Sequence, residues 1–143
     1  PDFYGDGRTP DTFDGRFELA TAFGVLALLR LKAAPEADRV AQLFTDKLFR
    51  LFDAGLREAG VGDLSVARRM KGLASAFYGR MTAYGAAMGD EAALAEALGR
   101  NIWNDPAAPY APVLARHLKA LHARQSTLPV GAIEEGTAWI TNA

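Results

Sequence analysis

Few residues in this chain could carry catalysis or bind a metal. The sequence contains no cysteine and two histidines, so a thiolate zinc site, an iron–sulfur cluster and a cysteine nucleophile are excluded. His117 and His122 lie five residues apart, which is about 140° around a helix, whereas paired metal ligands on a helix are three or four residues apart. Neither histidine has an acidic residue at that spacing. The sequence therefore predicts no metal, no haem and no other cofactor.

The carboxylates and serines form no pattern that is typical of an active site. Glu134 and Glu135 are neighbours that point in different directions on a helix, which argues against a coupled acid–base pair. Asp14 and Glu18 are four residues apart, but the positive end of a helix dipole and Arg16 explain them. No serine lies in a nucleophile-elbow sequence. The chain is predicted not to be an enzyme; a small enzyme or haem handler that uses the histidines is the alternative.

Composition predicts one soluble, all-helical domain over residues 1–143. A chain of 143 residues is of ordinary single-domain size. With 16 Lys and Arg against 17 Asp and Glu, the formal charge is −1, which argues against a general nucleic-acid binder, so no DNA partner is expected. The 28 alanines favour helices. Residues 19–31 are apolar but shorter than the roughly 20 residues of a membrane span, and they predict a central core helix.

The apolar spacing predicts a bundle of five main helices, an ordered N-terminal arm and a short C-terminal helix. Cap residues, prolines and glycines set the expected ends of each helix. The expected helices cover about residues 12–33, 35–60, 63–88, 90–104 and 109–125, with the short sixth helix at 130–135 and a tail through residue 139.

The expected third helix carries two rows of residues. Large apolar side chains recur at steps of three and four residues at Val66, Met70, Leu73, Phe77, Met81, Tyr84 and Met88. A second row, the small-residue row, consists of Gly72, Ala76, Gly79, Ala83 and Ala86. Glycine costs about 1 kcal/mol relative to alanine inside a helix, so the glycines predict that another backbone lies close to this row. The helix is expected to pack on two sides, or alternatively to dimerise through this row as a helical scaffold.

Basic, aromatic and amide side chains on the expected third and fourth helices are the remaining unusual feature. They are Arg68, Arg69, Lys71, Tyr78, Arg80, Tyr84, Arg100 and Asn101. One interpretation is a solvated basic flank beside the core stripe. The other is a docking surface, since Tyr and Arg are enriched among the anchors of protein interfaces. A basic surface of this kind would meet anionic lipid headgroups or ribosomal RNA.

Several short strings stand in an order along the chain that is typical of one protein family. The most specific are Pro10-Asp11-Thr12, Gly15-Arg16-Phe17-Glu18-Leu19, Phe77-Tyr78-Gly79-Arg80 and Arg100-Asn101. The longer segments Phe3–Phe23, Leu51–Met88 and Leu94–Trp103 extend the similarity over about residues 3–140. In order and spacing these segments resemble the ubiquinol–cytochrome c chaperone family, which includes mitochondrial assembly factors for the cytochrome bc1 complex and shorter alphaproteobacterial relatives.

The resemblance implies a chaperone that is not an enzyme. In mitochondria the family binds newly made cytochrome b and holds it for haem insertion and bc1 assembly, together with a small partner subunit and at the ribosome. The residues of this sequence in matching strings are Phe77, Tyr78, Arg80, Tyr84, Arg100 and Asn101. By comparison with the mitochondrial members, we expect this protein to have no mitochondrial targeting extension. We therefore expect a bacterial cytoplasmic protein, peripheral at the inner face of the inner membrane (the matrix side in a mitochondrion), where the small partner subunit can be absent.

Overall fold

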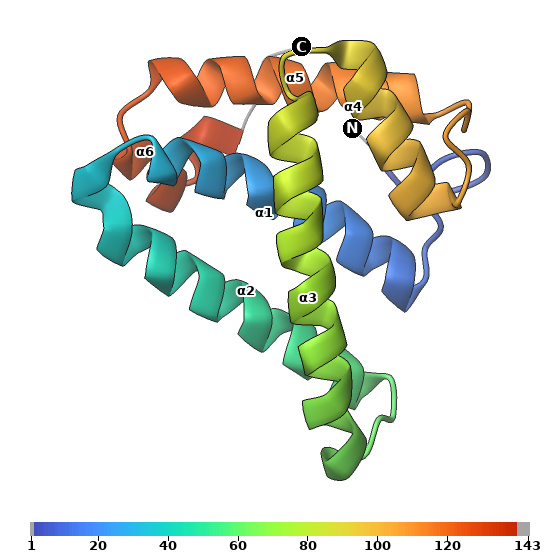
Figure 1. Ribbon diagram of the computed structural model, residues 1–143. Helices are drawn as coiled ribbons and strands as arrows, with labels where there is room; N and C mark the ends of the chain where they lie inside the picture. Colours follow the sequence, from blue (N-terminus) through green and yellow to red (C-terminus); the bar gives the residue numbers. More distant parts are fainter. Residues whose placement is uncertain (1, 140–143) are drawn as a thin grey trace.

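Helices make up 77% of the chain, as the alanine-rich sequence predicts. The computed structural model describes residues 2–139. Within this range there is no strand, and the α-helices are α1 (Phe13–Lys32), α2 (Asp38–Glu58), α3 (Asp63–Ala87), α4 (Glu91–Leu98), α5 (Ala111–Thr127) and α6 (Gly131–Glu134) (Figure 1). The all-α class, with five main helices and a short C-terminal helix, is confirmed. Residue 1 and residues 140–143 of the expected domain lie outside the described residues.

Capping residues determine where the helices begin. The Thr12 side chain accepts a hydrogen bond of 3.1 Å from the Gly15 amide at the start of α1. Asp90 caps α4 in the same way, with its carboxylate 2.9 Å from the Ala92 amide. Short polar side chains stabilise these positions because the first amides of a helix lack partners within it. Pro35 opens a 3-10 turn, and α2 starts only at the end of that turn.

The expected fourth helix changes its winding after Leu98. Residues 99–103 form a π-helical turn, and Asn104 then adopts a left-handed conformation with φ of 54°. A Cβ atom on Gly99 would collide with the carbonyl oxygen of Asp105. Glycine at position 99 therefore lets the chain fold back tightly from α4 towards α5.

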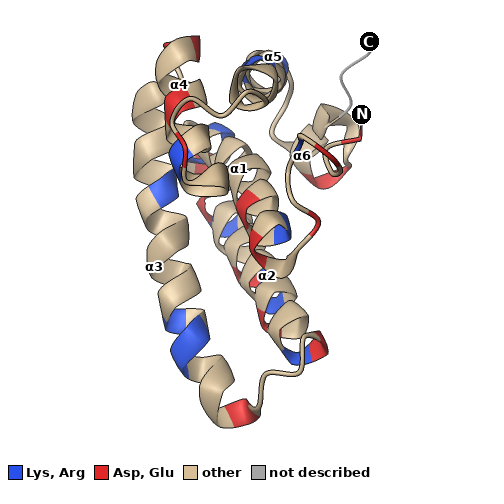
Figure 2. Ribbon diagram, turned by 90° about the vertical axis from the view of Figure 1, so that its right-hand side faces the viewer, with Lys and Arg blue, Asp and Glu red and all other residues tan. Residues whose placement is uncertain are grey.

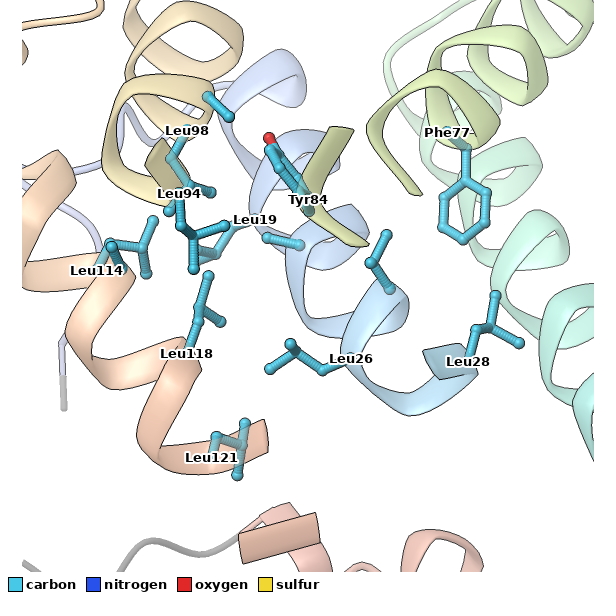
Figure 3. Close-up of a cluster of buried hydrophobic side chains, with 14 of the residues drawn as sticks. Leu19, Leu26, Leu28, Phe77, Tyr84, Leu94, Leu98, Leu114, Leu118 and Leu121 are labelled. Atoms are coloured by element: carbon cyan, nitrogen blue, oxygen red, sulfur yellow. The ribbon is translucent and has the colours of Figure 1, made fainter. Parts of the chain in front are cut away.

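The helix α1 lies at the centre of the molecule and contacts α2, α3 and α5 (Figure 1). Val25, Ala27 and Leu31 in this helix have no exposed surface. Leucines of α1, α4 and α5 pack with Phe77 and Tyr84 of α3 into one core (Figure 3). The central position that the sequence predicted for residues 19–31 is confirmed.

The helix α3 packs on one side only, so the expectation of packing on two sides is wrong. Its fully buried residues are Val66, Phe77 and Tyr84. The small-residue row is exposed apart from Ala76, which packs at the margin of the core. A Cβ atom on Gly72 or Gly79 would meet nothing within 4 Å. The physical reason is that α3 lies along one side of the bundle (Figure 2), and its N-terminal half projects past α1 together with the end of α2 (Figure 1).

The close backbone approach that the sequence placed on α3 occurs at Gly15 instead. A Cβ atom there would collide with the carbonyl oxygen of Pro10, because the N-terminal arm folds back onto the first turn of α1. The Trp103 indole holds the arm from the other side, since its Nε1 donates a hydrogen bond of 3.0 Å to the Arg8 carbonyl oxygen. The expected ordered arm is confirmed from residue 2 onwards.

Candidate functional site

Arg80, one of the candidate partner-binding residues, forms an ion pair inside the molecule. Its Nε lies 2.6 Å from Oε2 of Glu18, and its Nη2 donates to Oε1 of the same carboxylate. Burial raises the pKa of Glu18, and Arg80 opposes that rise. The two-point contact joins α3 to α1 and occupies the guanidinium group, so the expectation that Arg80 binds a partner is corrected to a structural role.

Phe77 and Tyr84 are buried to 99% or more, which corrects the expectation that they contact a partner. The Phe77 ring packs edge-on against Phe49 of α2, with 5.4 Å between the ring centroids. The pKa of the Tyr84 hydroxyl is far above its usual value, mainly because of burial and also because of the nearby Glu18 carboxylate. Both rings belong to the core, because they occupy the face of α3 that points into the bundle (Figure 3).

Tyr78, Arg100 and Asn101 lie nearer the surface than Phe77 and Tyr84. Tyr78 is 48% exposed and leans on Phe49, at 6.1 Å between ring centroids. Arg100 is exposed, and its Nη1 lies 3.5 Å from Oε2 of Glu96 in the same helical segment. The Asn101 amide is half-buried and donates a hydrogen bond of 2.9 Å to the Ala97 carbonyl oxygen. Of these three, Tyr78 and Arg100 offer surface to a partner.

Arg68, Arg69 and Lys71 are exposed on the N-terminal half of α3 (Figure 2). The guanidinium carbon of Arg69 lies 5.8 Å from the centroid of the Phe13 ring, a cation–π contact with α1. Arg68 and Lys71 have no carboxylate within 4.0 Å among residues 2–139. The structure therefore brings these three basic residues together and places them apart from Arg80 and Arg100.

An apolar groove of about 420 Å³ lies between the first turns of α1 and the second half of α2. Its apolar lining consists of Phe13, Phe17, Ala20, Leu48, Leu51, Phe52, Gly55 and Ala59. Leu51 is 69% exposed, which is unusual for a leucine that faces a hollow. The charged members of the lining are Asp11, Arg16 and Glu58. A groove of this composition can bury apolar side chains of a bound segment.

Gly55 leaves room in the groove beside the Phe13 ring. A Cβ atom on Gly55 would lie 3.2 Å from the Phe13 ring, so a side chain there would occupy part of the hollow. The groove is not predictable from local sequence patterns, since its two walls come from two different helices, α1 and α2. The sequence signal for the groove is Leu51. This leucine follows the apolar repeat of the second helix, yet the neighbouring helices leave 69% of it exposed.

The two histidines lie apart from both surfaces. The His117 ring packs edge-on against Phe3 and Phe23, with centroid distances of 5.1 and 6.1 Å. Burial lowers the pKa of His117 and His122, and Lys119 lowers that of His122 further. Within residues 2–139, no three His, Asp or Glu side chains lie close enough to hold a metal ion. The expectation that no cofactor binds stays a prediction.

The fold and these surfaces define a class of protein: an all-helical domain with an apolar groove and a basic helix face, both suited to binding another macromolecule. None of the helices in the described part of the chain has the length and apolar character that crossing a membrane requires.

Comparison with known proteins identifies the family. The model of a family described as "Ubiquinol-cytochrome C chaperone" matches residues 6–140. The chain therefore belongs to the ubiquinol–cytochrome c chaperone family, which confirms the resemblance. The crystal structure of the Cbp3 homolog from Brucella abortus is similar, with a TM-score of 0.81, 39% identity and coverage of 94% of this chain and 76% of that chain. No curated protein matches the sequence significantly.

Proposed function

We propose that the chain is an assembly factor that binds newly made cytochrome b and supports assembly of the cytochrome bc1 complex, at the inner face of the bacterial inner membrane. The observation that carries the proposal is the family match over residues 6–140. The similarity to a Cbp3 homolog over 94% of the chain supports it. No catalytic step is included in the proposal.

The groove between α1 and α2 is the part of the molecule best suited to the client. A membrane subunit that is not yet assembled exposes apolar segments, and burial of such a surface contributes about 25 cal/mol per Å². Leu51, Phe13 and Phe52 in the groove wall offer apolar contacts. Glu58 at the lining can pair with a polar end of the segment, whereas the Nε of Arg16 already donates a hydrogen bond to Asp11. The groove therefore accounts for client binding without using the buried Phe77 and Tyr84.

The test is deletion of the gene, followed by spectra of b-type haem and native gels for the bc1 complex. We expect both the b-type haem signal and the bc1 band to fall. Complementation with the wild-type chain restores them, whereas Leu51→Asp, which places a charge in the groove, does not. The matched control is Leu43→Asp, because Leu43 is a 50% exposed leucine of the same helix outside the groove.

Unchanged bc1 levels in the deletion strain would refute the proposed function. Normal assembly with Leu51→Asp would refute the groove as the client site and leave the function standing.

The resemblance also names a ribosome and a small partner subunit as further partners. Mass spectrometry of proteins that copurify with the tagged wild-type chain would identify them.

A further inference from the structure

The outward side of the N-terminal half of α3 combines an exposed leucine with basic residues. Leu64, Arg68 and Lys71 are spaced by four and three residues, so their side chains share one face of the helix. Leu64 is 96% exposed. Arg68 and Lys71 have no carboxylate within 4.0 Å among the residues that the structure describes. Nothing in the described fold accounts for this combination.

The charge around this face is positive, although the whole chain is close to neutral. The hairpin tip, defined here as residues 57–72, contains four basic and two acidic residues. Arg57 hydrogen-bonds to Asp63 as well as to Asp53, so Asp63 next to Leu64 is already paired. The turn at residues 59–62 carries no charge. The start of α3, which contains Leu64, thus lies at a projecting end of the molecule (Figures 1 and 2). The positive charges of Arg68 and Lys71 follow Leu64 on the same helix.

We propose that the hairpin tip docks on an anionic lipid surface, with Leu64 inserted at the level of the headgroups and Arg68 and Lys71 against the lipid phosphates. An apolar side chain flanked by basic residues on one helix face is the arrangement that binds such surfaces. RNA would use the basic residues, but it gains nothing from a leucine that is 96% exposed. The lipid surface therefore explains both features of the face.

The inference rests on the proposed function for its setting, because a chaperone for a membrane subunit has to work beside the membrane. The lipid-docking proposal adds to the proposed function by naming the surface of the chain that contacts the membrane. The docking face and the groove use different residues, since Leu64, Arg68 and Lys71 belong to α3 and the groove is lined from α1, α2 and the residues just before α1.

The experiment is co-sedimentation of the purified full chain with vesicles of phosphatidylcholine, with or without an equal amount of phosphatidylglycerol. We expect binding to the anionic vesicles only, weakening as salt is added. The double variant Arg68→Gln/Lys71→Gln should lower the partition coefficient by about 25-fold, at roughly fivefold for each basic residue. Leu64→Gln should lower it by about tenfold, through loss of apolar burial.

Matched controls change the same chemistry elsewhere. Lys32→Gln/Arg39→Gln removes two exposed charges, one at the end of α1 and one in the first turn of α2. Val113→Gln replaces a 53% exposed apolar residue on α5. Both control variants should bind as the wild type does. Circular dichroism verifies the fold of each variant. Arg68→Ala/Lys71→Ala, which keeps good helix formers at both positions, replaces the glutamine variant if that one is unfolded.

Three outcomes would overturn the proposal. The first is a wild-type chain that stays in the supernatant with anionic vesicles. The second is equal binding by the tip variants and their controls. The third is binding to poly(U) RNA that depends on Arg68 and Lys71, together with no binding to vesicles. The assay contains no cytochrome b, so its failure leaves the chaperone proposal untouched, and failure of the deletion test leaves the vesicle result standing.

Discussion

At the scale of single residues, the contact between Glu18 and Arg80 makes the clearest prediction. Both side chains are largely buried, at 10% and 20% exposed. Arg80→Met leaves the Glu18 carboxylate without its partner, which should lower the free energy of unfolding by about 3 kcal/mol. Urea denaturation followed by circular dichroism measures this loss.

The control for Arg80→Met is Arg100→Met. Arg100 pairs with Glu96 at the surface at 3.5 Å, and exposed pairs of this kind contribute at most about 1 kcal/mol. The double variant Glu18→Gln/Arg80→Met should recover part of the loss, because it removes the buried charge as well. Equal effects of the two single methionine variants would show that the Glu18 contact is not structural.

The imidazole of His117 predicts a dependence of stability on pH. Burial lowers its pKa below the ordinary value of 6.5, so just below pH 6.5 the unfolded chain binds more protons at this position than the folded chain does. The free energy of unfolding should therefore fall as the pH drops below 6.5, and the contribution is fully present above that value. Urea denaturation at pH 7.5 and at pH 5.5 measures the change.

His117→Phe keeps an aromatic ring beside Phe3 and Phe23 but cannot be protonated. The difference in stability between the two pH values should be smaller in this variant than in the wild type. A variant that loses as much stability as the wild type would show that His117 is not among the groups that titrate on unfolding.

At the scale of helices, two glycines that look alike in sequence should respond to alanine in opposite ways. Gly15→Ala forces a Cβ atom against the Pro10 carbonyl oxygen and should destabilise the protein. Gly79→Ala meets nothing within 4 Å, so it should stabilise α3 by about 0.5–1 kcal/mol. Thermal denaturation of both variants should show a lower melting temperature for Gly15→Ala and a higher one for Gly79→Ala than for the wild type. Destabilisation by Gly79→Ala would mean that the small-residue row is packed against something.

At the scale of the whole molecule, we predict that the purified protein carries neither metal nor haem. The chain has no cysteine; its two histidines lie five residues apart, and within residues 2–139 no group of ligands converges. Elemental analysis should find no stoichiometric metal, and the absorption spectrum should show no Soret band. Either signal would restore the alternative of a haem handler that uses His117 or His122.

The sequence by itself determined the helices and the family. Asp90 located the start of α4, and the start of α1 was narrowed to Asp11 or Thr12, of which Thr12 is the cap. A short polar side chain next to an apolar repeat is a local signal. Periodicity also located the core stripe of α3 with Phe77 and Tyr84, which requires only the helical repeat of 3.6 residues. The ordered strings from Pro10 to Asn101 indicated the family that the comparison then confirmed.

Only the tertiary structure decided which helix faces are covered and by what. Arg80 looked like part of a basic face, yet its partner Glu18 is 62 positions away and lies on another helix. Gly79 looked like a contact point, but no atom of a neighbouring element among residues 2–139 lies within 4 Å of a Cβ atom at that position. The groove has walls from both α1 and α2, so it depends on how these two helices pack. A periodic pattern assigns a residue to a face of its own helix, but the neighbour of that face depends on how all the helices pack.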